Sequence, residues 1–199
     1  MTMSTYTFSK DSPLNTALRD PEGNIAYQIS TPFAFGSSET AIKRGGQVIA
    51  TIQWKAFRSS TLTMRGESAR IKDIFPRTER LSTSRVYTMP NGESFKWEDG
   101  SKFHCVSVDS KVTLATYTRR VVHWFKKDEK PTLDIIQDVG VDKTDALVVT
   151  WVIAEEKVRR AESSKRHRSS SMHHNNMHHT SIHHGGIGGG GGMSGMGGC

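Results

Sequence analysis

Histidine pairs near the C-terminus are the residues whose type and spacing point most directly to chemistry. They recur every five residues, as His173, His174, His178, His179, His183 and His184. Neutral imidazole is a good ligand for Zn²⁺, Cu²⁺ or Ni²⁺, and two or three pairs could share one ion. The alternative is low-complexity sequence without a metal role. The pattern predicts a flexible metal ligand or an inert segment, and the sequence indicates no other cofactor.

Basic residues form a second candidate site, on the ends of two predicted strands and the turn between them. They are Arg119, Arg120, Lys126, Lys127 and Lys130. An anionic lipid headgroup gains about 1 kcal/mol per nearby Lys or Arg. These residues therefore predict a rim that binds an anionic, phosphoinositide-containing membrane surface, and a solvated charged face is the alternative. A further cluster, diluted by acids, holds Arg65, Arg70, Lys72, Arg77 and Arg80.

Motifs of enzymes are missing from the sequence. There is no Gly-x-Ser-x-Gly, no His-Glu-x-x-His and no Gly-rich phosphate loop between a strand and a helix. His104 and Cys105 are adjacent, so in a strand they face opposite sides and cannot act as a dyad. We predict no catalytic residues and a binding or scaffold module. The alternative is a small-ligand protein or enzyme that uses the mouth of the folded domain.

Charge and composition divide the chain near residue 162. All 20 acidic residues lie at or before Glu162, so residues 1–162 carry +4 and residues 163–199 carry +3 of the net +7. The later segment holds seven of the nine His and ten of the 18 Gly. It cannot bury enough apolar surface to offset the entropy lost on ordering. We predict one domain over 1–162 and a disordered tail over 163–199.

Cysteine use and hydropathy bear on the compartment and the partners. Cys105 lies in an apolar run and Cys199 is the last residue, so a disulfide between them is not expected. The apolar run Ala146–Ala154 is far shorter than the roughly 20 residues of a transmembrane helix, and no signal peptide is evident. An intracellular protein, cytoplasmic or peripheral to a membrane, is therefore predicted. The net charge allows nucleic acid as a partner, but no motif supports it.

Alternation of apolar and polar residues predicts strands through most of the domain. Residues 25–30, 48–55 and 61–65 alternate with period two, and Asn91-Gly92 predicts a hairpin that pairs 83–89 with 94–98. In all, about ten strands follow at spacings of 8–12 residues, which is typical of a sandwich or barrel.

A helix is predicted over 142–162, because no turn residue interrupts that stretch. The part from Ala146 to Ala154 is apolar on every side, and a buried strand is the alternative. Such a helix must be enclosed by the sheet, so Val149, Trp151 and Val152 should be inaccessible. Trp54 and Trp97 are also predicted in the core, while Trp124 is a weaker candidate.

Several of these segments together resemble a fungal family of unknown function, common in mushrooms and grouped with the tubby C-terminal-like domains. The matching motifs are Arg85-Val-Tyr-Thr, Pro90-Asn-Gly, Phe95-Lys-Trp97, Leu133-Asp-Ile135 and the stretch Ala146–Arg160. The resemblance implies an antiparallel β-barrel of about 10–12 strands closed around a hydrophobic C-terminal helix. Tubby-like relatives include phosphoinositide-binding proteins and membrane scramblases. The resemblance carries no phosphate-contact residue over to this chain.

Overall fold

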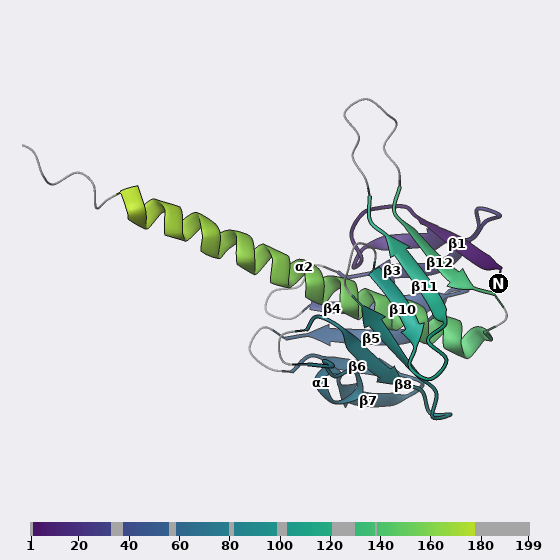
Figure 1. Ribbon diagram of the computed structural model, residues 1–199. Coiled ribbons are helices and arrows are strands. Elements are labelled where there is room, and N and C mark those ends of the chain that lie inside the picture. Colours follow the sequence, from purple (N-terminus) through teal and green to yellow (C-terminus); the bar gives the residue numbers. More distant parts are fainter. Residues whose placement is uncertain are drawn as a thin grey trace, which may run out of the picture. The chain divides into compact units, whose positions relative to one another are not determined.

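Most of the chain is described by a computed structural model (Figure 1). Side chains of the long C-terminal helix are described as far as Ser164. The described residues are 2–32, 38–55, 59–79, 82–98, 103–120, 130–137 and 139–177.

Twelve strands form one antiparallel sheet, so the fold is mainly β, as predicted. The strands are β1 (Met3–Phe8), β2 (Thr16–Arg19), β3 (Ile25–Ser30), β4 (Ser38–Arg44), β5 (Gln47–Trp54), β6 (Thr61–Met64), β7 (Glu67–Arg70), β8 (Arg85–Thr88), β9 (Ser94–Glu98), β10 (Phe103–Ser107), β11 (Thr113–Thr118) and β12 (Thr132–Ile136). Their order is β7-β6-β5-β4-β3-β2-β1-β12-β11-β10-β9-β8, so the first and last strands of the chain are neighbours.

The sheet is not closed, which corrects the prediction of a closed barrel. β7 and β8 are its two edges, and in the described part of the chain they do not pair with each other. The connection between them, which begins with the short helix α1 (Ile71–Ile74), takes up the free edge of β8. Val86 donates its N–H to the carbonyl of Pro76, and Arg77 forms a bridge with Arg85. Because the preceding segment occupies this edge, β7 cannot use it to close the sheet.

The second helix, α2 (Val141–Met177), begins at the margin of the sheet and then runs between its strands (Figure 1). The stretch Ala146–Ala154 is buried on every side, and Val149, Trp151 and Val152 have no exposed surface, as predicted. Residues of strands that are not neighbours in the sheet contact the helix. Trp97 of β9 donates its indole N–H to Thr150 at 2.9 Å, and the Phe8 ring of β1 lies 4.9 Å from that of Trp151. The helix therefore fills the space that the sheet surrounds.

The end of α2 differs from the prediction more than its start. The helix begins one residue before the predicted start at 142 and runs past the predicted end at 162 to Met177. It thus covers the first part of the segment predicted to be disordered, because no Gly or Pro occurs between residues 141 and 184. Residues 178–199 lie outside the described residues.

Several local predictions are confirmed. β8 pairs with β9 through the Asn91-Gly92 turn, in which Gly92 takes the positive φ of 87°. Trp54, Trp97 and Cys105 are buried, while Trp124, His123 and the strand predicted at 121–126 lie outside the described residues. Burial raises the pKa of the Cys105 thiol, which fits a core residue without reactivity.

Two compact units divide the chain, Met1–Arg160 and Ala161–Cys199. The first ends two residues before the predicted domain boundary at 162. Among the described residues, no helix combines the length and the apolar composition needed to cross a membrane.

Candidate anion-binding site

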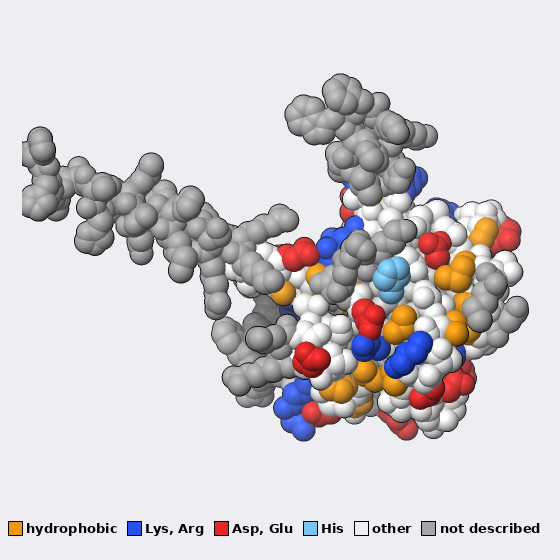
Figure 2. Space-filling model, viewed as in Figure 1, with side chains coloured by type: hydrophobic (Ala, Val, Ile, Leu, Met, Phe, Trp, Pro, Cys, Tyr) orange, Lys and Arg blue, Asp and Glu red, His pale blue; other side chains and the backbone are white. Residues whose placement is uncertain are grey.

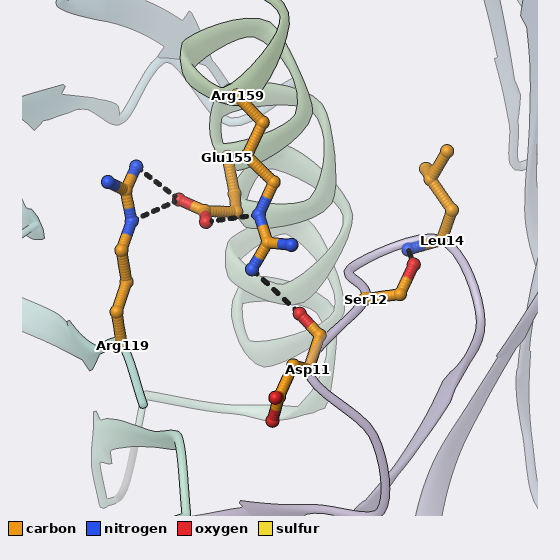
Figure 3. A network of polar contacts seen from close by, with 6 residues as sticks. All are labelled: Asp11, Ser12, Leu14, Arg119, Glu155 and Arg159. Atoms are coloured by element: carbon orange, nitrogen blue, oxygen red, sulfur yellow. Dashed lines mark hydrogen bonds and ion pairs between the residues drawn. The ribbon is translucent and has the colours of Figure 1, made fainter. Parts of the chain in front are cut away.

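The predicted basic rim is engaged with acidic partners where the structure describes it. Glu155 of α2 has no exposed surface and lies between two arginines (Figure 3). Arg119 donates from Nε and Nη2 to Glu155 Oε2 at 3.3 and 3.1 Å. Arg159 donates from Nε to Oε1 at 2.7 Å and from Nη2 to the carbonyl of Asp11 at 2.7 Å. The buried carboxylate is therefore compensated by two guanidinium groups.

The rest of the predicted rim is not brought together in the described residues. Arg120 forms an ion pair with the Asp11 carboxylate at 2.8 Å, and Lys130 is exposed. Lys126 and Lys127 lie outside the described residues. Arg119 and Arg120 tie the end of β11 to α2 and to the loop after β1, so much of their charge is already matched.

Three other cations lie together without such matching. Arg77 follows α1, Arg85 begins β8, and Lys157 lies on α2, two residues after Glu155. In the described part of the chain, none of the three has a carboxylate within ion-pair distance. We call Arg77, Arg85 and Lys157 the cationic triad.

Backbone pairing brings two members of the cationic triad, Arg77 and Arg85, close to each other. Arg77 and Arg85 are directly opposite partners in an antiparallel bridge, which puts their Cβ atoms about 4.5–5.5 Å apart on one face. Like charges in that arrangement are destabilising. Arg85 is only 7% exposed, and its Nη1 donates to the carbonyl of Phe75 at 2.8 Å. Burying a cation without a counter-ion costs several kcal/mol of folding free energy, so a bound anion would stabilise this arrangement.

The pKa values of Lys157 and Arg85 are both lowered, which agrees with this crowding of cations. The pKa of Lys157 is lowered by burial first and then by the charges of Arg85, Arg160 and Arg77. The pKa of Arg85 is lowered by burial and by Arg77. An anion bound nearby would therefore stabilise the charged forms of both residues.

Aromatic side chains keep the cations in place. The Lys157 ammonium and the Arg160 guanidinium lie over the Trp54 ring, at 5.9 and 4.8 Å from its centre. The Trp54 indole N–H is itself fixed by a 2.8 Å hydrogen bond to Thr40. Contacts of this kind hold a cation without neutralising it. Arg160 also pairs with Glu156 at 2.6 Å, so it borders the triad but carries an acidic partner.

Charge elsewhere on the surface is mixed. Figure 2 shows acidic and basic side chains interspersed over the visible face. The cationic triad is therefore distinguished by the absence of a paired acid among the described residues, and not by an overall excess of positive charge.

Residues 11–160 match the model of a family of unknown function, DUF6593. The chain belongs to the DUF6593 family. Every member of the cationic triad lies within the matched residues, and so do Trp54 and the buried part of α2.

Other comparisons add little to this family assignment. A solved structure of a protein from Arabidopsis thaliana is similar over 77% of this chain and 90% of that chain, with 13% identity and a TM-score of 0.43. No curated protein matches the chain.

Sequence reasoning on this DUF6593 chain placed the triad residues in separate patterns. Arg77 belonged to a cluster diluted by acids, Arg85 to a family motif, and Lys157 to the helix end. Only Arg85 could have been singled out from the sequence. It is a charged residue at the start of a strand, at a position that the alternation pattern assigns to the core.

The predicted metal ligands are not tested by the described residues. His173 and His174 fall in α2, where side chains are not described, and His178, His179, His183 and His184 lie outside the described residues. Within the described part of the chain, no group of three or more His, Cys, Asp or Glu could hold a metal ion. His104 is half-buried, with Nδ1 at 3.3 Å from the Thr116 hydroxyl.

Proposed function

We propose that this protein is a non-enzymatic binding module for an anionic membrane surface, and that the cationic triad takes a phosphorylated headgroup. The observation that carries the proposal is the set of Arg77, Arg85 and Lys157, close together and without a paired carboxylate among the described residues. A phosphate would accept hydrogen bonds from the planar guanidinium groups and a point-charge contact from the ammonium. Such a headgroup would offset the repulsion among the three positive charges of the triad.

A multiply phosphorylated inositol lipid suits this arrangement best. Three neighbouring cations match a ligand with more than one negative charge. Each Lys or Arg near an anionic membrane adds about 1 kcal/mol to binding. The described rim residues Arg119, Arg120 and Lys130 would add a weaker attraction, since the two arginines already bind carboxylates.

The tubby-like relation, a fungal origin and an intracellular, membrane-peripheral location are parts of the same proposal. A twelve-stranded antiparallel sheet that surrounds an apolar C-terminal helix supports the relation and a barrel-like description. Because α2 fills the interior, ligands must bind at the ends of the sheet or on its outside. This filling favours a binding module over an enzyme that would need a deep central cavity.

Co-sedimentation of the full chain with liposomes tests the proposal. We expect binding to phosphatidylcholine vesicles that contain 5% phosphatidylinositol 4,5-bisphosphate, and no binding to pure phosphatidylcholine. Arg77→Glu changes the local charge by two, so binding should weaken about 30-fold, from about 2 kcal/mol. Arg77 is exposed, so the variant should fold normally.

Lys111→Glu is the matched control, since it makes the same change of charge at an exposed turn between β10 and β11. It should bind like the wild type. Equal weakening by both variants would indicate a response to net charge and would contradict a site at the triad. Equal binding to both kinds of vesicle would contradict the membrane proposal altogether.

A further inference from the structure

A cavity of about 470 Å³ opens where α2 begins, at the opposite end of its buried stretch from the cationic triad. Its walls come from β1, β3, β12 and the end of β4, and from the first turn of α2 with the residues just before it. The residues that matter here are Tyr6, Tyr27, Arg44, Ile136, Val139 and Thr144. The volume falls within the range of small-molecule sites, about 300–1,000 Å³.

The body of the cavity is apolar and aromatic. Tyr6 and Tyr27 meet edge to face, with ring centres 6.2 Å apart. Ile136 and Val139, both half-buried, supply aliphatic surface. Burial raises the pKa of both tyrosines, so their hydroxyl groups are neutral at physiological pH. A flat apolar group can therefore pack against neutral aromatic and aliphatic walls.

One charged group lines this cavity among the described residues, the guanidinium of Arg44. Its Nε lies 3.4 Å from Asp145 Oδ1, an atom that also accepts a 2.8 Å hydrogen bond from the Tyr27 hydroxyl. Asp145 is 5% exposed and does not line this cavity, although it lines the neighbouring one together with Arg44. In the described part of the chain, the ion pair of Arg44 with Asp145 runs through Nε, and its two terminal nitrogens donate no hydrogen bond.

A guanidinium held by Nε and open at its two Nη atoms has the geometry that binds a carboxylate with two parallel hydrogen bonds. We propose that this cavity binds a small aryl carboxylate, with its ring between Tyr6, Tyr27 and Val139 and its carboxylate on Arg44. The proposal is independent of membrane binding, because it uses none of the triad residues.

Titration of the ¹⁵N-labelled full chain with 3-phenylpropionate and with its neutral amide, 3-phenylpropionamide, tests this site. We expect the acid to shift the backbone amide signals of Tyr27, Arg44 and Val139, and to bind at least ten-fold more tightly than the amide. Arg44→Gln should abolish the preference for the acid and leave the weak binding of the amide unchanged. Arg19→Gln is the control, since this arginine donates to the carbonyl of Gly23 and does not line the cavity.

Two further measurements keep the test decisive. Val139→Trp, which fills the cavity without changing charge, should reduce the affinity for both probes even if Arg44→Gln destabilises the domain. Sedimentation of Arg44→Gln with phosphoinositide vesicles should match the wild type, which separates this site from the membrane site. Equal affinity for acid and amide in the wild-type chain, or an unchanged preference in Arg44→Gln, would overturn the proposal.

Discussion

Arginines at the two ends of the buried part of α2 stand in opposite electrostatic settings. Where the helix begins, Arg44 lies 3.4 Å from Asp145 and Arg65 lies 3.2 Å from Asp142. Near Lys157, in contrast, Arg77 and Arg85 face each other without a carboxylate at ion-pair distance among the described residues. The first setting is compensated before any ligand binds, and the second is not.

That difference indicates what each end can recognise. An arginine that is already paired with a carboxylate can orient a ligand through its two remaining hydrogen-bond donors. Most of the binding free energy must then come from apolar contact with the ligand. Uncompensated cations retain repulsion, so a polyanion gains both attraction and relief of that repulsion. We therefore expect selectivity for shape at the start of α2 and selectivity for charge near Lys157.

The largest effect is expected from a substitution that disrupts both ends of the buried part of α2. Val149 has no exposed surface and lies midway along the buried stretch of α2, so Val149→Asp places a charge where it has no partner. We expect a loss of at least about 5 kcal/mol, comparable with the whole stability of a typical domain. Far-UV circular dichroism during urea unfolding measures this loss. Val48→Asp, at a position that is 56% exposed, is the control and should change stability by less than about 1 kcal/mol.

A variant of Val149 that folded with normal stability would show that the two ends are not held in place by the helix between them. Both proposed sites would then have to be reconsidered, since Arg44 and Lys157 depend on α2 for their neighbours.

Much of this framework could be predicted from the sequence because its signals are local. The alternation of apolar and polar residues predicted β3, β5 and β9, and an uninterrupted apolar stretch predicted the buried part of α2. Closure of the sheet was predicted wrongly, because it depends on how the connection through Phe75 and Pro76 packs against β8. No local sequence pattern predicts whether this connection or β7 pairs with β8.

The candidate sites were less predictable than the fold. The cationic triad joins a loop, a strand and a helix, and its character depends on which acids pair with other cations. Arg119 and Arg159 look the same as Lys157 in a count of charges, yet they compensate the buried Glu155. Only a three-dimensional arrangement shows which positive charges remain unmatched.

Alkaline pH gives a second, smaller test of the comparison. All four tyrosines have raised pKa values, and burial is the first cause in each case. Their protonated forms stabilise the folded state below the unfolded pKa of about 10, and this stabilisation is lost as pH rises through the folded values. For Tyr117 the folded pKa is about 12. We therefore expect stability to fall from pH 10 upward.

Absorbance at 295 nm and circular dichroism, followed together from pH 9 to 13, measure this effect. Tyrosinate should form in step with unfolding, while the chain in guanidinium chloride should titrate near pH 10. Tyr27, beside Asp145, should ionise after Tyr117, whose pKa is partly lowered by Arg159 and Arg119. Ionisation of all four tyrosines near pH 10 without unfolding would contradict the buried environment at both ends.

The smallest expected effect is a gain of stability at the end that binds anions. Lys157→Met removes a half-buried charge that three arginines oppose, and the methionine can keep the packing of the lysine stem against Trp54. We expect an increase of about 0.5 kcal/mol in the free energy of unfolding, together with weaker binding to phosphoinositide vesicles. Arg159→Met, two residues along the same helix, leaves Glu155 with one arginine and should instead lower stability by about 2–3 kcal/mol. Urea unfolding of both variants at pH 7 decides between these outcomes. If both substitutions destabilised the domain alike, Lys157 would be compensated like Arg159, and the contrast between the two ends of the helix would disappear.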